Sequence, residues 1–201
     1  MKKGERRKQE LLQIAYRMFV EKGYDNTSVD EIIAEAGIAK GTYYYYFPSK
    51  EAALEAVIDM MIDEEAGRAK AVVGSPMPVP QKVAAVIYSF RPVQGEESIA
   101  NAVEAEENIV LHEKLNKRII AEATPILAEV VREGIEQGIF DCGQIEERVR
   151  MVLILSAQAF DDGNVTEDSV TAFMDIVEKT FGAQPGTMGF VRGLIAGGAK
   201  S

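Results

Sequence analysis

Residues 40–47, Lys-Gly-Thr-Tyr-Tyr-Tyr-Tyr-Phe, combine the side-chain types that proteins use to contact duplex DNA. A lysine ammonium binds phosphate, and a threonine offers a hydroxyl to phosphate and a methyl group to thymine. Tyrosine hydroxyls reach phosphate oxygens, and a glycine lets the backbone approach a partner closely. This segment, called the aromatic run below, therefore predicts a nucleic-acid contact.

The four tyrosines must divide between two sides of a helix, because successive helical positions turn by about 100°. Tyr43 and Phe47 are four residues apart, and we expect them to pack inward with Ile33 and Ile38. A consecutive aromatic run is more often core than binding surface, but four in a row exceed what so short a helix can bury. The residues expected on the outward side are Lys40, Gly41, Tyr44 and Tyr45.

The segments before the aromatic run supply the helices that must position it. Apolar residues recur at helical spacing over residues 11–19, and Gly23 ends that first helix. Ser28 followed by Glu31 is a capping box that begins a second helix, which Gly37 ends after about two turns. The aromatic run follows at once. Two short helices joined by a glycine turn and braced by a longer one predict a helix-turn-helix.

Net charge divides the chain into two parts. Residues 1–50 hold nine Lys and Arg against seven Asp and Glu, whereas residues 51–201 carry a net charge of −12. Residues 1–8 form a basic arm, in which Arg6, Arg7 and Lys8 are candidate phosphate contacts. A basic arm on a weakly positive module favours local phosphate binding, although a merely solvated basic N-terminus would carry the same charges.

The remaining sequence shows helical periodicity and no convincing strand alternation, so the predicted fold class is all-α. Ser49 is a plausible N-cap for a helix that ends at Val73, and three prolines in residues 74–80 mark the clearest break. We expect Pro125 to kink or divide the longest later helix. The expected later helices are 81–91, 97–107, 108–138, 144–161 and 166–182.

Residues 27–29, 32–47 and 49–54 resemble the signature of the TetR (tetracycline-repressor) family of transcription regulators. The resemblance covers roughly residues 8–60, and the chain length and the helical acidic remainder agree with it. It implies an N-terminal three-helix DNA-binding domain followed by an all-helical ligand-binding and dimerisation domain. The implied boundaries are 1–50 for the helix-turn-helix domain, 51–73 for a connecting helix and 74–201 for the effector-binding and dimerisation domain.

The resemblance also assigns DNA contacts. It implies that Thr27 and Ser28 contact phosphate at a helix N-terminus and that Lys50 clamps a phosphate at the start of the next helix. Ala39 replaces the usual serine and removes a capping hydroxyl, and Tyr46 stands where the family often has histidine. These departures leave the base sequence unpredicted. The contacts implied for the recognition helix are Lys40, Gly41, Thr42, Tyr44, Tyr45 and Tyr46.

Two apolar helices near the C-terminal end are expected to pack against a second copy of the chain. The last helix carries an apolar stripe, and the helix before it is apolar on nearly all sides and needs cover on two faces. A homodimer would match a palindromic DNA site by its two-fold symmetry; an internal core is the alternative. The predicted interface residues are Val149, Leu153, Phe160, Val170, Phe173, Met174, Val177 and Phe181.

A small-molecule effector is expected in the acidic body, and no cofactor or metal is expected. Buried carboxylates there would favour a cationic or amphipathic ligand. A metal site around His112 is the less favoured alternative. The candidate pocket residues are Tyr88, Phe90, Glu104, Glu107, Leu111, His112 and Phe160.

Together these observations predict a ligand-responsive repressor that binds a palindromic operator as a homodimer. We find no secretory signal and no apolar stretch long enough to span a bilayer, so a cytoplasmic location without membrane attachment is expected. An enzyme is disfavoured because the chain has no nucleophile motif and no phosphate-binding glycine loop. A purely structural helical protein would leave the aromatic run and the basic arm without a role.

Overall fold

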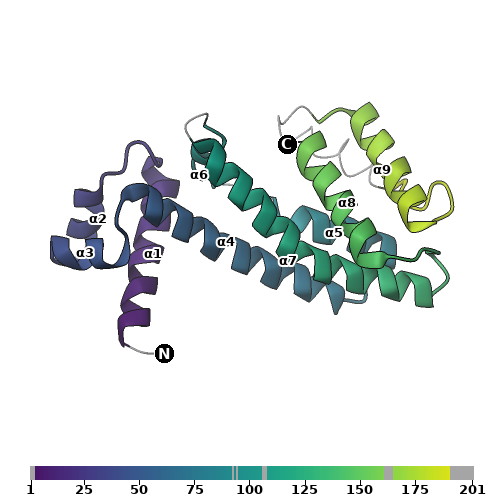
Figure 1. Cartoon of the computed structure of the whole chain (residues 1–201), viewed down its shortest axis with the longest axis horizontal. Helices are drawn as coiled ribbons and strands as arrows, with labels where there is room; N and C mark the ends of the chain where they lie inside the picture. Colours follow the sequence, from purple (N-terminus) through teal and green to yellow (C-terminus); the bar gives the residue numbers. More distant parts are fainter. Residues whose placement is uncertain (1–2, 92, 94, 106–107, 161–164, 191–201) are drawn as a thin grey trace. The chain divides into compact units, whose positions relative to one another are not determined.

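The computed structural model describes all residues except 1–2, 92, 94, 106–107, 161–164 and 191–201 (Figure 1). The described residues form α-helices joined by turns and contain no strand, which confirms the all-α fold class. The helices are α1 (Lys3–Lys22), α2 (Val29–Ala36), α3 (Lys40–Tyr46), α4 (Lys50–Val73), α5 (Val79–Ser89), α6 (Glu97–Glu104), α7 (Ile109–Glu136), α8 (Ile145–Ala159) and α9 (Glu167–Phe181).

The chain forms two compact units, and the first extends beyond the predicted boundary at residue 50. It comprises residues 1–64 and 92–115, so the first part of α4 and all of α6 belong with the helix-turn-helix. Hydrogen bonds attach the start of α6 to α1 and to the turn after it. The Tyr16 hydroxyl donates to Glu96 Oε1 at 2.8 Å, and the Tyr24 amide donates to Ser98 Oγ at 3.0 Å.

Aromatic side chains form much of the first unit's core. Phe19 is fully buried, and its ring contacts the Tyr24 ring edge-on at a centroid distance of 5.2 Å. Tyr43 and Phe47 are also buried, with their ring centroids 5.7 Å apart, which confirms their predicted inward orientation. Further buried side chains come from α1, α2 and α4, so these helices hold α3 at a fixed angle: Leu11, Ala15, Met18, Ile32, Ala53, Leu54, Val57 and Ile58.

The second unit, residues 65–91 and 116–201, packs α5, α7, α8 and α9 around one apolar cluster. Seven residues predicted to form the dimer interface are buried in this cluster, and Met174 packs against it. These side chains therefore belong to the core of the chain itself, which is the internal-core alternative for these residues, and a dimer through α8 and α9 would have to use other side chains. The affected residues are Val149, Leu153, Phe160, Val170, Phe173, Met174, Val177 and Phe181.

Pro125 lies inside α7, which continues on both sides of it, so of the two outcomes expected at this residue, a kink or a division, the division does not occur. A proline removes one backbone hydrogen bond from a helix. On either side of it, Ala123, Ile126 and Leu127 are buried, and the Thr124 hydroxyl donates to the Ile120 carbonyl at 2.6 Å. Burial of these apolar side chains offsets the lost hydrogen bond and keeps the helix continuous.

Candidate nucleic-acid interface

The turn between α2 and α3 has the geometry that the sequence predicts. Ser28 is the N-cap of α2 and forms a capping box with Glu31. Gly37 ends α2 with a φ of 60°, a left-handed conformation that glycine adopts without the steric cost of a Cβ. The N-cap of α3 is Ala39, which makes no side-chain capping hydrogen bond. The missing capping hydroxyl is therefore confirmed, and the packing of Tyr43 holds α3 instead.

The exposed side of α3 presents the predicted DNA-contacting residues. Tyr45 is 81% exposed and Tyr44 43% exposed, although both belong to the run that also supplies the buried Tyr43. The Tyr45 ring packs edge-on against Tyr46 at 5.0 Å, which restricts its orientation. Gly41 is exposed, and a Cβ built on it would have no neighbour within 4 Å. The fold itself therefore does not require glycine at this position.

Thr27 and Ser28 use their donors within the protein, which argues against their predicted phosphate contacts. Thr27 is 1% exposed, and its hydroxyl lies 2.8 Å from the Gly23 carbonyl. The Ser28 amide and hydroxyl both donate to Glu31 Oε2 at 2.8 Å. Hydrogen bonds from Ser28 and from Lys22 lower the pKa of Glu31 to about 2, so this carboxylate stays charged at neutral pH. Both residues stabilise the start of α2 in this structure.

Lys50 is held at the start of α4 by Tyr24. Its ammonium donates to the Tyr24 carbonyl at 2.7 Å and lies 4.1 Å from the centroid of the Tyr24 ring. These contacts fix the lysine at the junction between the α1–α2 turn and α4. They leave other ammonium hydrogens for a phosphate, because a lysine carries three donors.

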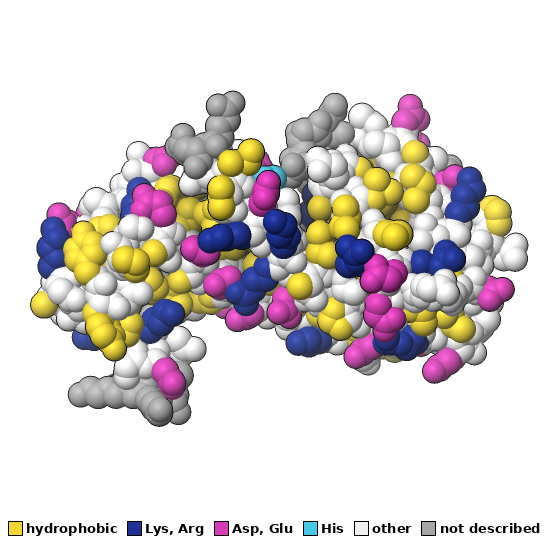
Figure 2. All heavy atoms as spheres, viewed as in Figure 1, with side chains coloured by type: hydrophobic (Ala, Val, Ile, Leu, Met, Phe, Trp, Pro, Cys, Tyr) yellow, Lys and Arg dark blue, Asp and Glu magenta, His cyan; other side chains and the backbone are white. Residues whose placement is uncertain are grey.

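The basic arm belongs to α1, since the helix already begins at Lys3. Arg6 and Arg7 are exposed and both pair with Glu10, at 3.5 and 3.0 Å. The Lys8 ammonium lies 5.9 Å from the Phe47 ring centroid, next to the end of α3. Figure 2 shows acidic side chains interspersed with the basic ones on the visible face. The positive groups of this region are therefore accompanied by carboxylates.

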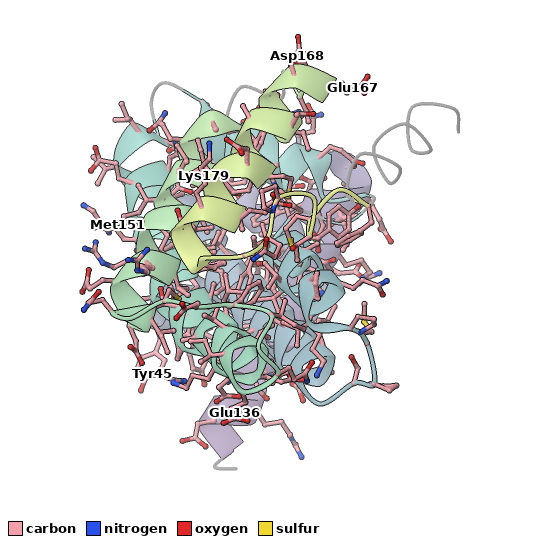
Figure 3. All side chains as sticks on the ribbon, turned by 90° about the vertical axis from the view of Figure 1, so that its right-hand side faces the viewer. Tyr45, Glu136, Met151, Glu167, Asp168 and Lys179 are labelled. Carbon is pink, nitrogen blue, oxygen red and sulfur yellow. The ribbon has the colours of Figure 1, made fainter. Side chains whose placement is uncertain are left out.

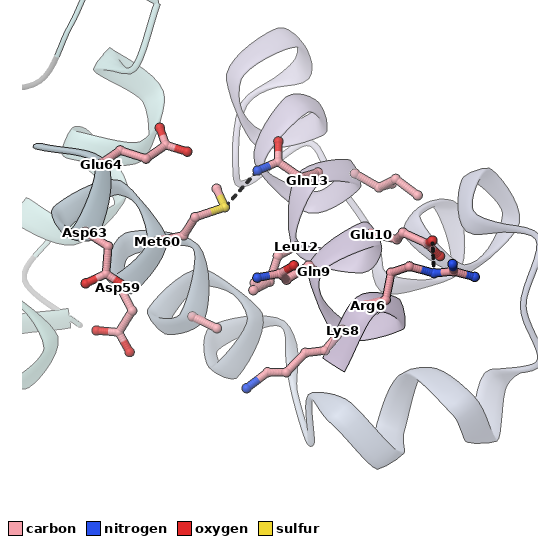
Figure 4. Close-up of a pocket in the computed structure, with 12 residues that line it drawn as sticks. Arg6, Lys8, Gln9, Glu10, Leu12, Gln13, Asp59, Met60, Asp63 and Glu64 are labelled. Carbon is pink, nitrogen blue, oxygen red and sulfur yellow. Dashed lines mark hydrogen bonds and ion pairs between the residues drawn. The ribbon is translucent and has the colours of Figure 1, made fainter. Parts of the chain in front are cut away.

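A cleft of about 790 Å³ lies within the first unit, between α1 and α4 (Figure 4). Lys8 and Gln9 line it from α1, and Asp59 and Asp63 line it from α4. The Gln13 amide reaches across to the Met60 sulfur at 3.0 Å. Sequence reasoning missed this cleft, because its existence depends on how α1 crosses α4, and neither helix has an unusual residue pattern.

The predicted effector residues are divided between the two units. Glu104, Leu111 and His112 belong to the first unit, and Glu107 lies outside the described residues. In the second unit Tyr88 is 78% exposed, whereas Phe90 and Phe160 are part of the apolar core. The described residues contain no group of three His, Cys, Asp or Glu side chains that could hold a metal ion. Within the same residues, no helix is long and apolar enough to cross a membrane.

A helix-turn-helix whose second helix, here α3, exposes tyrosines, a lysine and a glycine is typical of DNA-binding transcription regulators. A model of bacterial regulatory proteins of the tetR family matches residues 11–57, and a tetracyclin repressor-like C-terminal domain model matches residues 91–174. The two models together cover more than half of the sequence. The chain belongs to the TetR family of transcription regulators.

Two relatives align over most of the chain. The fatty acid metabolism regulator protein of Bacillus subtilis (strain 168) is 28% identical over 142 residues, covering 69% of this chain and 73% of that protein. The transcriptional repressor KstR2 of Rhodococcus jostii is 26% identical over 138 residues, covering 67% and 68%. The regulator YuxN of Bacillus subtilis is 44% identical, but over only 54 residues, which is 27% of this chain and 19% of YuxN.

Solved structures with low sequence identity share the fold. RolR in complex with resorcinol matches with a TM-score of 0.65 and 20% identity, covering 94% of this chain and 93% of RolR. FadR from Bacillus subtilis in complex with stearoyl-CoA matches with a TM-score of 0.51 and 23% identity, covering 86% and 97%.

Proposed function

We propose that this regulator is a ligand-responsive repressor that binds a palindromic operator as a homodimer. The observation that carries the proposal is the exposed side of α3, where Tyr44 and Tyr45 project although neighbouring aromatic residues are buried. Exposed aromatic side chains beside a lysine and an uncrowded glycine favour a partner with phosphates and stacked bases. Repression requires only that operator occupancy blocks polymerase, so the chain needs no additional activating surface.

Exposed apolar residues on α8 and α9 support the homodimer. Met151 is 60% exposed, and Ile154 on α8 and Ile176 on α9 are each 42% exposed. Figure 3 shows Met151 and Lys179 on the outer side of their helices. Met151 and Ile154 are three residues apart and therefore share one side of α8, and exposed large apolar side chains are typical of protein interfaces. A second copy that packs the same face against this one would form a two-fold symmetric interface.

Selection of duplex DNA from a random pool by the purified full chain tests the proposed function. We expect enrichment of a palindrome, which the protein should bind at least a thousandfold more tightly than a scrambled duplex, as specific regulators do. Titration at two salt concentrations then separates phosphate contacts from base contacts. If no sequence is enriched even after the protein has been unfolded, dialysed and refolded to remove any bound effector, the proposal is wrong.

An acyl-CoA is the first effector class to test, because one of the relatives that align over most of the chain is a fatty acid metabolism regulator protein. FadR, which shares the fold, binds stearoyl-CoA. The second unit holds a large apolar cluster that suits an acyl chain, and an acyl-CoA falls within the cationic or amphipathic ligands expected from the sequence. An acyl-CoA that binds the protein should release the operator, whereas free CoA should not. A bound acyl-CoA that leaves operator affinity unchanged would exclude this coupling.

Gly41→Ala is expected to weaken operator binding without destabilising the protein. Nothing lies within 4 Å of the added Cβ, and alanine favours a helix by about 0.5–1 kcal/mol over glycine. The methyl group would instead obstruct a close approach of the backbone to DNA. Thermal unfolding should show an unchanged or raised Tm, while fluorescence anisotropy shows weaker operator binding. Wild-type affinity in this variant would remove Gly41 from the DNA interface.

A further inference from the structure

In the proposed DNA interface, cationic side chains that would contact phosphates are already paired with carboxylates of the protein. The Lys40 ammonium at the start of α3 lies 3.0 Å from Asp30 Oδ1, and both side chains are mostly exposed. On α1, Glu10 pairs with Arg7 at 3.0 Å and with Arg6 at 3.5 Å. Before these cations can contact a phosphate, each must leave its carboxylate or share it.

These ion pairs contribute little to folding. All five side chains of the two groups are well exposed, and exposed pairs are screened by water and salt. The Arg6–Glu10 and Arg7–Glu10 pairs lie within a single helix and attach no second element to it. Asp30 lies in the first turn of α2, where Ser28 and Glu31 already form the cap. An acid in the first turn of a helix stabilises it by about 0.3–1 kcal/mol, and the Asp30–Lys40 pair joins α2 to α3, so Asp30 makes a modest contribution to the fold. Glu10 has neither role.

The same carboxylates have a direct consequence for an approaching duplex. The N-terminus of a helix carries a partial positive charge that favours phosphate. In α2 the charged side chains of Asp30 and Glu31 lie in that first turn. Asp30 also raises the pKa of Lys40, which shows that the two charges interact. A phosphate near α2 and α3 would meet repulsion from Asp30 in addition to competition for Lys40.

We infer that Asp30 and Glu10 are built-in competitors of DNA phosphate that lower the affinity of the reading surface for every duplex. The inference rests on the proposed function, in which α3 reads the operator. Binding is then an exchange, in which a phosphate replaces an internal carboxylate at Lys40, Arg6 or Arg7. On random DNA, phosphate contacts alone must offset the free energy that is lost when these internal ion pairs break. On the operator, base contacts of α3 add to them, so only the operator retains the protein at physiological salt.

Asp30→Asn tests the inference most directly. We expect this variant to bind the operator and a scrambled duplex of equal length about threefold to fivefold more tightly than the wild type at low salt, as the loss of one nearby charge repulsion implies. The ratio of the variant's affinity to that of the wild type should fall towards one at high salt, where exposed charges are screened. Glu10→Gln should change both affinities in the same direction. Affinity measured by fluorescence anisotropy that is unchanged or weaker in Asp30→Asn overturns the inference.

A double-variant cycle shows whether Asp30 acts through its lysine. If it does, Asp30→Asn gains less affinity in a Lys40→Gln background than in the wild type. The matched control is Glu146→Gln, which removes the same charge from an exposed ion pair with Arg132 in the second unit. Glu146→Gln should leave the affinities for the operator and for the scrambled duplex unchanged. If it raises them as much as Asp30→Asn does, the effect comes from the net charge of the protein alone, and the inference is overturned.

Lys40→Gln by itself separates failure of the inference from failure of the proposed function. If Lys40→Gln weakens binding while Asp30→Asn has no effect, the reading surface is correct and the competition is not. If Lys40→Gln binds every duplex as the wild type does, Lys40 does not contact the DNA and the inference is overturned, whereas the proposed function, which Tyr44 and Tyr45 carry, is still decided by the selection from a random pool.

Discussion

Tyr43→Ala is expected to unfold the helix-turn-helix and abolish operator binding. Tyr43 is fully buried, its ring contacts Phe47, and its hydroxyl lies 3.4 Å from the Ser49 carbonyl. Removing a buried aromatic ring costs about 3–5 kcal/mol, since it deletes apolar contacts and leaves a cavity. For a unit of this size the loss corresponds to a fall in Tm of roughly 10 °C or more.

The neighbouring tyrosine supplies the matched control. Tyr45 is 81% exposed on the same short helix, so Tyr45→Ala should leave the Tm nearly unchanged and yet weaken operator binding. Circular dichroism measures the Tm, and fluorescence anisotropy at a temperature where the wild type and Tyr45→Ala are folded measures operator affinity. A Tyr43→Ala variant with wild-type Tm would show that the core of the first unit does not depend on this ring.

The contrast between Tyr43 and Tyr45 illustrates what the sequence can predict. Helical periodicity alone places one inward and the other outward, because they are separated by about 200° on the helix. The ends of α2 are equally local, since Ser28, Glu31 and Gly37 form their caps within a few residues of the chain. Such features depend on neighbours in sequence, and they were predicted correctly.

Thr27 and Ser28 show where the residue type is ambiguous. A hydroxyl side chain at a helix N-terminus either contacts a phosphate or satisfies the protein's own backbone. The structure gives both residues internal partners, at Gly23 and at Glu31. Whether the hydroxyl contacts phosphate or a group of the protein depends on its burial and on the acceptors near it. For a turn that packs against α1, neither the burial nor the nearby acceptors can be predicted from the sequence.

The C-terminal helices show a second limit. Their apolar stripes were read correctly as buried, but periodicity does not say which surface covers them. In the structure Val149 and Phe173 are covered by the same chain, and the side that remains for a partner carries Met151, Ile154 and Ile176. The effector residues were harder still, because a pocket depends on long-range packing. The sequence predicts Tyr88 in a pocket wall, and in the structure its side chain is exposed.

The exposed face of α8 and α9 leads to the second large effect. Ile154→Asp is expected to convert the proposed homodimer into a monomer, because a charge in an apolar interface without a partner is strongly unfavourable. Met151 and Gln158 flank Ile154 on the exposed side of α8, so the carboxylate would lie in the centre of that face. Sedimentation velocity should show the mass of a single chain.

Loss of the dimer should also reduce operator affinity by roughly 10²–10⁴-fold, because two linked reading heads bind far more tightly than one. Tyr88→Asp is the matched control: it introduces the same charge at an exposed aromatic residue of α5 in the same unit, and it should leave dimer mass and affinity unchanged. If Ile154→Asp does not fold, Ile176→Asp tests the same face from α9. A dimer that persists in a folded variant of this face would mean that the two copies pair through another surface.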